Sequence, residues 1–546
     1  QTGGGKTEAY LCIISFLLFK SSFQPKTISD PGTQVFIRYT LRLLTTQQFE
    51  RATALVLASE FIRKTSNLCN PDSKVFSIGL WIGQPSSPNS RKEAFDLLEN
   101  EEIQAGDPRQ ITKCPCCNSL LVWDLKPDKP ISPSCKNSSC KLNGNLSLYT
   151  VDEDIYNVRP SILLGTTDKF IRILKVTNTN NLFYSLTGRN PELILQDELH
   201  LISGPLGSIS GLFESAIDMI SSKKYPIKII GSTATIKNAS IQVKTLFDRD
   251  LVQFPPQGTS FKDSCFAVED ETKMGRLYIG LSTMCNSPKL ALASIVAAAF
   301  HHAQSIYKRL EIDNTFKNQA ETYTTLVSYF NSLKELGGAN VLYQDQVIEK
   351  LKSIARDFKE EIFSINNIRE LTSQRSQQQI KQYLDELNMT REEEDVIDAC
   401  LSTNMISVGV DVSRLGLMII NGQTKSKSEY IQASSRVGRK YPGIVISIYN
   451  SNKVRDKSCY ENFKDIHQNL YKDVEVTSLT PFSPDCIKKV LPSVIVTACR
   501  HLSDDALNSP DLRKFQETFK YVSNFLLERC RNISPENLKF LNNEIK

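Results

Sequence analysis

The chain has 546 residues, of which 40% are hydrophobic and 23% are charged, and its formal net charge is +5. This length predicts two or more soluble globular domains, and the mildly basic balance permits nucleic-acid binding without arguing for it. The 14 cysteines are scattered except for one cluster, which excludes a small secreted disulfide scaffold.

The chain begins with a glycine-rich loop that leads into an apolar helix. The loop residues are Thr2, Gly3, Gly4, Gly5, Lys6, Thr7 and Glu8. Glycines let the backbone curl so that amide N–H groups point at phosphate oxygens. Lys6 would reach the β- and γ-phosphates, and Thr7 would give its hydroxyl to Mg²⁺. The pattern predicts an ATP site of the P-loop type, and a chance Gly-Lys-Thr turn is the alternative.

Because the first residue is Gln1, we expect the strand that precedes such a loop to lie upstream. The apolar run at residues 10–19 is half the length needed to cross a bilayer. We therefore expect a buried helix there, in a cytoplasmic protein without a membrane partner.

Two pairs of cysteines form the cluster. Cys114 and Cys117 are separated by two residues, and Cys135 and Cys140 by four. Two such knuckles complete the tetrahedron of a structural Zn²⁺ site, in which four thiolates leave no open position for catalysis. Cys116 could replace Cys117, although a one-residue gap makes a poorer chelate. A disulfide pair or unlinked thiols are the alternatives.

An acidic pair follows an apolar run in PELILQDELH. Residues 193–195 predict a central strand of a parallel sheet, and Asp197 and Glu198 would stand at its carboxyl end. Asp197 would hold Mg²⁺, mostly through water, and Glu198 would polarise the water that attacks the γ-phosphate. An exposed acidic strand end is the alternative.

The next apolar strand runs into the sequence STAT, which contains Ser232, Thr233 and Ala234. Hydroxyls at such a strand end can bridge to the acidic pair or to His200. Taken alone, this stretch predicts only a strand and a turn.

Two further stretches lie about twenty residues apart near the end of the chain. Gly409 and Asp411 fit a tight loop between a strand and a helix. Gln432, Arg436 and Arg439 have spacings of four and three, which would place them on one helix face. The arginines would form surface salt bridges or, alternatively, act as arginine fingers that neutralise charge in phosphoryl transfer.

In this order, TGGGKT, DELH, STAT, VGVDVSRLG and QASSRVGR resemble motifs I, II, III, V and VI of superfamily 2 helicases and translocases. Stretches such as IRYTLRLLTTQQFERA, DELHLISGPLGS and VTSLTPFSP further resemble the helicase subunits of DISARM phage-defence systems. The resemblance implies an α/β fold with two RecA-like lobes and ATP in the cleft. Lys6, Asp197 and Glu198 would lie on the first lobe, and Arg436 and Arg439 on the second.

On this basis we expect the first lobe at residues 1–236, with a zinc-binding insertion at 85–155. A connector would span 237–320 and the second lobe 321–470. A mostly helical extension would occupy 471–546.

The resemblance also implies DNA bound through its phosphates across both lobes, with a DrmB-like subunit as a partner. The candidate contacts are Arg42, Thr45, Gln47, Gln48, Thr166, Thr167 and Lys169. A helix cap or a surface hydrogen bond is the alternative for each. Two other functions remain open. One is an RNA helicase with the same two ATPase lobes, and the other is an ATPase switch or scaffold that does not unwind nucleic acid.

Overall fold

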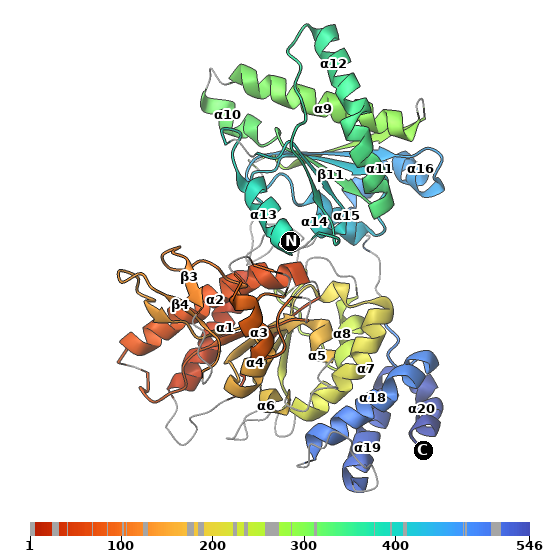
Figure 1. The fold of residues 1–546 in the computed structure, drawn as a ribbon. Helices are drawn as coiled ribbons and strands as arrows, with labels where there is room; N and C mark the ends of the chain where they lie inside the picture. Colours follow the sequence, from red (N-terminus) through yellow and green to blue (C-terminus); the bar gives the residue numbers. More distant parts are fainter. Residues whose placement is uncertain are drawn as a thin grey trace. The chain divides into compact units, whose positions relative to one another are not determined.

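The computed structural model describes residues 6–23, 32–40, 42–67, 69–83, 86–100, 103–104, 106–123, 129–171, 179–183, 191–221, 226–233, 238–256, 272, 274–284, 287–310, 314–375, 377–393, 396–407, 412–472, 474, 478–503 and 515–546. The chain forms two compact units. One combines Gly3–Gln253 with Val476–Lys546, and the other is Phe254–Glu475 (Figure 1).

A parallel sheet forms the centre of the first unit. Within the described residues it has six strands in the order β6-β2-β7-β1-β8-β9. The strands are β1 (Val35–Tyr39), β2 (Ile78–Trp81), β6 (Leu148–Tyr149), β7 (Ile162–Thr166), β8 (Leu193–Gln196) and β9 (Lys228–Gly231). Each neighbouring pair is parallel. All carboxyl ends therefore meet at one edge of the sheet, where ligands bind in open α/β folds.

The sequence explains the middle of this sheet. Residues of β1, β7 and β8 are buried throughout, because helices cover both faces of a parallel sheet and leave no solvated face. The short runs of Val, Ile, Leu and Phe in these strands match that environment.

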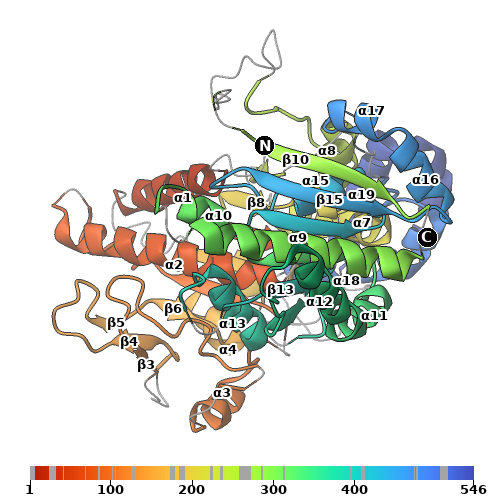
Figure 2. The same cartoon turned by 90° about the horizontal axis from the view of Figure 1, so that it is seen from above.

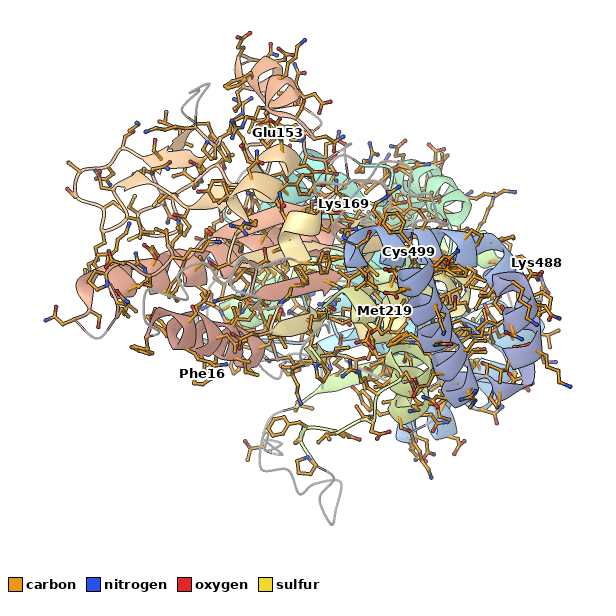
Figure 3. All side chains as sticks on the ribbon, turned by 90° about the horizontal axis from the view of Figure 1, so that it is seen from below. Phe16, Glu153, Lys169, Met219, Lys488 and Cys499 are labelled. Carbon is orange, nitrogen blue, oxygen red and sulfur yellow. The ribbon has the colours of Figure 1, made fainter. Side chains whose placement is uncertain are left out.

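The helices of the first unit, other than those at the C-terminus, alternate with the strands along the chain, and the first of them precedes β1. They are α1 (Lys6–Ser22), α2 (Arg42–Thr65), α3 (Arg91–Leu98), α4 (Asp152–Val158), α5 (Thr167–Ile171), α6 (Asn180–Phe183), the 3₁₀ helix η4 (Leu199–Leu201), α7 (Gly204–Ser221) and α8 (Ala239–Phe247). Ile14 and Leu18 of α1 are buried, whereas Phe16 projects outward from the same helix (Figure 3).

A small antiparallel sheet lies beside the edge strand β6 (Figure 2). Its strands are β3 (Leu121–Trp123), β4 (Pro133–Cys135) and β5 (Gly144–Asn145). The chain leaves β5 and enters β6 two residues later, so this sheet is attached directly to the edge of the main one.

The end of the chain returns to the first unit. Its helices are α18 (Pro484–Leu502), α19 (Gln516–Ile533), the 3₁₀ helix η5 (Pro535–Asn537) and α20 (Leu538–Ile545). Met219 of α7 and Cys499 of α18 belong to one buried apolar cluster, which also includes Phe36 of β1 (Figures 1 and 3). The C-terminal helices are therefore part of the core of the first unit.

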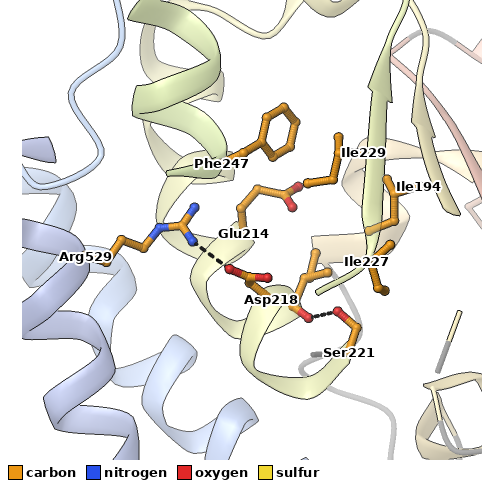
Figure 4. A pocket seen from close by; sticks show the side chains of 9 residues that line it. Ile194, Glu214, Asp218, Ser221, Ile227, Ile229, Phe247 and Arg529 are labelled. Carbon is orange, nitrogen blue, oxygen red and sulfur yellow. Dashed lines mark hydrogen bonds and ion pairs between the residues drawn. The ribbon is translucent and has the colours of Figure 1, made fainter. Parts of the chain in front are cut away.

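A buried arginine ties α19 to α7. Arg529 is 2% exposed, its Nη1 lies 3.4 Å from Asp218 Oδ2, and its Nη2 donates to Leu246 O at 2.9 Å. Figure 4 shows its guanidinium above Asp218 and near Glu214. The cavity at this place measures about 10 Å³. That volume is no larger than about one water molecule requires, so it is not a ligand site.

Replacing Arg529 with Ala is expected to lower the free energy of unfolding of the first unit by about 2–3 kcal/mol. Breaking a buried ion pair costs somewhat more, but Asp218 keeps its second partner, Arg249. Urea denaturation would measure the loss. Arg531→Ala on the exposed face of α19 is the matched control and should change stability by less than about 0.5 kcal/mol. Equal effects of the two variants would contradict the assignment.

The second unit contains another parallel sheet, in the order β10-β15-β14-β11-β13-β12 among the described residues. Its strands are β10 (Arg276–Ser282), β11 (Leu326–Phe330), β12 (Ile368–Leu371), β13 (Ala399–Ser402), β14 (Leu417–Asn421) and β15 (Gly443–Tyr449). Its helices are α9 (Pro288–Leu310), α10 (Asn314–Glu321), α11 (Leu333–Gln344), α12 (Gln346–Phe358), α13 (Gln377–Asn388), α14 (Asn404–Ser407), α15 (Lys427–Ser434), α16 (Val454–Glu461) and α17 (Phe463–Gln468).

Helix α9 is the one described helix with the length and apolar composition to cross a membrane. Val296 and Phe300 on this helix are fully buried and pack in the core of the second unit. His301 is buried and pairs with Glu360, whereas His302 is exposed. The adjacent histidines thus face different environments, and α9 is a core helix of this unit.

The units differ from the expected domain boundaries. The segment expected as a connector, 237–320, instead supplies α8 to the first unit and β10, α9 and α10 to the second. Within the expected insertion, 85–155, β6 already pairs with β2 of the main sheet. The extension at 471–546 starts in the second unit and continues into the first. Pairing and packing between distant segments fix these boundaries, and local composition does not report them.

Candidate nucleotide and zinc sites

The carboxyl end of β8 presents the acidic pair. Asp197 is 9% exposed, and its amide donates to Arg38 O of the neighbouring strand at 3.0 Å. Glu198 has a left-handed backbone, with φ of 48°, and its amide donates to Asp197 Oδ1 at 2.9 Å. A left-handed non-glycine residue turns the chain sharply at some cost in strain. The two carboxyl groups consequently stand next to each other at the ligand-binding edge.

Burial and the charge of Glu198 raise the pKa of Asp197 above its ordinary value. A hydrogen bond from Ser232, the amide of Glu198 and the charge of Lys6 act in the opposite direction. Lys6, in the first turn of α1, is thus one of the charges that act on this carboxyl group.

His200 links the acidic pair to the strand end of β9. Its Nδ1 lies 3.0 Å from Thr233 Oγ1 and 3.4 Å from Glu198 Oε2. The amide of Leu199 also donates to Ser232 O at 3.0 Å. These contacts hold the segment after β8 against the segment after β9, as the hydroxyl-rich sequence led us to expect.

A pair of tyrosines beside this site was not anticipated from the sequence. Tyr10 of α1 and Tyr39 at the end of β1 are buried, and their hydroxyl oxygens are 2.9 Å apart. Tyr10 follows Thr7 by three residues, a spacing that places two side chains on one helix face. That spacing was the available signal for Tyr10. Nothing local pointed to Tyr39.

Several predicted residues lie outside the described part of the chain. These are Thr2, Gly3, Gly4, Gly5, Ala234, Gly409 and Asp411, together with the side chains of Arg42, Thr45 and Gln47. Glu8 is described and is exposed, where it forms an ion pair with Arg51.

The predicted nucleic-acid contacts in GTTDKF are interior groups. Lys169 is 5% exposed, and its Nζ lies 2.5 Å from Asp152 Oδ2. The same Nζ lies over the ring of Trp81, 5.8 Å from the ring centroid. Thr166 is buried, and Thr167 Oγ1 donates to Tyr39 O at 3.1 Å. A buried ammonium needs a counter-charge, and Asp152 supplies it. The prediction for Lys169 is therefore wrong: its ammonium forms a structural ion pair with Asp152 and is not available to a phosphate.

In the second unit the arginines do not share a helix face with Gln432. Helix α15 ends at Ser434, so Arg436 and Arg439 lie in the turn that follows. Arg436 Nη2 donates to Ser407 O at 2.5 Å, and Arg439 Nε donates to Ser435 O at 3.4 Å. The expected continuous helix is thus corrected to a helix and a turn.

Two glycines explain why the helix stops. Gly438 has a left-handed backbone with φ of 71°, a conformation that favours glycine. A Cβ at Gly438 would lie 2.8 Å from the amide nitrogen of Gly443, where β15 begins. The backbone can approach itself this closely only because neither Gly438 nor Gly443 has a side chain. The turn between α15 and β15 carries both arginines.

The four predicted cysteines meet in the small antiparallel sheet. Their Sγ atoms all lie within 4.8 Å of one another. The Cys114–Cys140 and Cys117–Cys135 sulfur distances are 3.8 and 3.6 Å. Zn–S bonds of about 2.3 Å in a tetrahedron place sulfurs about 3.8 Å apart, whereas a disulfide bond is about 2.05 Å long. The donor set therefore fits a Zn²⁺ ion, and the exposed Cys116 stands outside it.

The knuckles are built from tight turns. The amide of Asn118, which has φ of 58°, donates to Cys114 O at 2.9 Å, and the amide of Leu142 donates to Cys140 Sγ at 3.3 Å. Hydrogen bonds with Ser119 lower the pKa of Cys117 to about 6, whereas burial raises the pKa of Cys135 and of Cys140. Amides aimed at sulfur and an easily ionised thiol both favour thiolate ligands.

Comparison with known proteins finds a family model for part of the chain and similar solved structures. Residues 321–441 match the model of the helicase conserved C-terminal domain. Two solved helicases align with most of the chain: Mycobacterium smegmatis Lhr bound to single-stranded DNA and AMP-PNP (TM-score 0.45, 13% identity, 90% of this chain and 50% of that one) and the DUF1998 helicase MrfA bound to DNA and AMPPNP (TM-score 0.47, 12% identity, 95% and 59%). The chain is a protein of the superfamily 2 helicase class.

Within this class it is a relative of the DISARM protein DrmA of Bacillus paralicheniformis. The two sequences are 36% identical over 98% of this chain and 53% of DrmA. The chain thus spans about half the length of the curated relative that it matches.

Proposed function

We propose that the protein is an ATP-dependent DNA helicase or translocase, the motor of a DISARM-like anti-phage system in the cytoplasm. The observation that carries this proposal is the pair of adjacent carboxyl groups, Asp197 and Glu198, with His200 beside them at the carboxyl edge of the first sheet, where the charge of Lys6 also acts on Asp197. Paired carboxyl groups at this edge, served by a lysine from a glycine-rich loop, are the arrangement that P-loop hydrolases use. The kinship with DrmA supports the cellular context.

Each residue has a defined task in this proposal. Lys6 holds the phosphates, while Thr7 and Asp197 hold Mg²⁺, directly or through water. When bound, Mg²⁺ neutralises charge on the β- and γ-phosphate oxygens. Glu198 orients the attacking water and takes its proton. His200, between Glu198 and Thr233, keeps the glutamate in place.

The second unit would contribute Gln432, Arg436 and Arg439 as groups that neutralise charge on the triphosphate. Their sequence pattern carries this part of the proposal. Gly409 and Asp411 would serve the nucleotide from the loop before them. Zn²⁺ would be structural, since four thiolates leave it no open position.

DNA is the proposed substrate, bound through its phosphates, and a DrmB-like subunit is the proposed partner. On the first unit we retain Arg42, Thr45, Gln47 and Gln48 at the start of α2. Contacts of this kind tolerate many sequences and weaken steeply with salt.

The test compares matched single-stranded DNA and RNA as stimulators of ATP hydrolysis, with strand displacement measured in parallel. We expect DNA to stimulate hydrolysis more than RNA does, and displacement to require ATP. Greater stimulation by RNA would favour the RNA helicase. Hydrolysis without displacement or translocation would favour the switch or scaffold.

A further inference from the structure

The tyrosine pair joins three elements of the first unit. Tyr10 and Tyr39 are 4% and 1% exposed, and their hydroxyl oxygens are 2.9 Å apart. Tyr10 Oη also lies 3.4 Å from Thr7 Oγ1 and 3.5 Å from Gln48 Oε1. One buried hydroxyl therefore touches both a proposed nucleotide-site residue on α1 and a proposed nucleic-acid residue on α2.

The supply of protons restricts how this cluster can be arranged. A tyrosine hydroxyl carries one proton to donate, and a carboxamide oxygen can only accept. The contact between Tyr10 and Gln48 Oε1 is therefore a hydrogen bond only when Tyr10 donates. Tyr10 can then accept from Thr7 or Tyr39, whose hydroxyls can act either way. Donation to Thr7 and donation to Gln48 exclude each other.

Both tyrosines remain protonated in this environment. Burial raises the pKa of Tyr10 and of Tyr39, and the charge of Asp197 adds to the effect on each. The hydroxyls therefore change their hydrogen bonds by rotation, and ionisation plays no part.

We propose that Tyr10, supported by Tyr39, is a positioning residue that couples the nucleotide site at Thr7 to nucleic-acid binding at Gln48. The inference rests on the proposed function. With Mg²⁺ held at Thr7, that hydroxyl would be a weaker acceptor and a stronger donor, because the metal would occupy one of the two lone pairs and draw charge from the oxygen. The hydroxyl of Thr7 would then donate its proton to Tyr10. Tyr10 then donates to Gln48 and fixes the amide in one orientation. Without nucleotide, Tyr10 is free to donate to Thr7, and Gln48 loses that restraint.

The experiment measures the dissociation constant of labelled single-stranded DNA with and without AMP-PNP and Mg²⁺. The ratio of the two constants reports the coupling between the sites. In Tyr10→Phe the ratio should move toward one by about threefold or more, as expected for one lost hydrogen bond. AMP-PNP binding without DNA should stay within about twofold, because Phe fills the same space.

Tyr343→Phe is the matched control. Tyr343 is a fully buried tyrosine of the second unit, and its hydroxyl lies 2.6 Å from Ser328 Oγ. This variant loses a comparable hydrogen bond and should keep the wild-type ratio. An unchanged ratio in Tyr10→Phe overturns the coupling role while the proposed function stands. A wild-type protein that neither hydrolyses ATP nor shows a ratio different from one overturns both.

A second variant decides the question if Tyr10→Phe lowers the melting temperature strongly. Gln48→Met keeps the length of the side chain and removes the acceptor. We expect the ratio of the two dissociation constants to move toward one, as in Tyr10→Phe, whether or not the affinity for DNA itself changes. A wild-type ratio in Gln48→Met would overturn the proposal.

Discussion

Replacing Glu198 with Gln is expected to lower ATP turnover by at least about 100-fold, while ATP binding stays within about twofold. The amide keeps the size of the carboxyl group but cannot take a proton from water, and general bases contribute about 10²–10⁴-fold. The half-buried side chain beside His200 should hold the amide in place. Phosphate release under saturating ATP and titration with a fluorescent ATP analogue measure the two quantities.

The matched control is Glu192→Gln, six residues earlier and directly before β8. Glu192 forms a partly exposed ion pair with Lys20 at 2.7 Å, a kind of contact that contributes little. Its turnover should equal that of the wild type. If Glu198→Gln hydrolysed ATP at the wild-type rate, Glu198 would lose the role of general base.

Replacing Cys135 with Ser is expected to remove the metal and unfold the small antiparallel sheet. We expect about one Zn²⁺ per wild-type chain and almost none in the variant, because a structural site needs all four thiolates and its binding energy is also folding energy. Cys135 is fully buried on β4, the middle strand, so the loss should reach both neighbouring strands. Elemental analysis gives the zinc content, and hydrogen exchange over residues 113–145 reports the folding.

Cys116→Ser is the control for this variant, since the exposed Cys116 lies outside the group of four. It should keep its zinc. Protection of β8 and α7 should survive in both variants, because the cysteines form an apolar cluster separate from the main core. Loss of zinc from Cys116→Ser, or its retention in Cys135→Ser, would show that the ligand set is different.

The features that sequence predicted well are local. An apolar run before Asp197 marked a central strand, and the spacing of Cys114 and Cys117 marked a knuckle, because each pattern follows from contacts within a few residues. The structure places the acidic pair at the strand end and gathers the four sulfurs.

The features that sequence missed depend on distant partners. Lys169 looked like a surface cation because nothing near it in the chain reveals that Asp152 meets it in the interior. The end of α15 at Ser434 depends on the close approach of Gly438 and Gly443. The segment of β10 was assigned to the expected connector because its partner strand, β15, lies far along the chain.

Because Val476–Lys546 packs into the same unit as Gly3–Gln253, the order of synthesis matters. Helix α7 emerges from the ribosome well before α18, which covers it. Because synthesis adds about 5–20 residues per second, the apolar face of α7 stays uncovered for tens of seconds while the whole second unit is translated. Newly made chains therefore expose the apolar face of α7 to chaperones and proteases during this interval, and a premature stop before Pro484 would release them with that face bare.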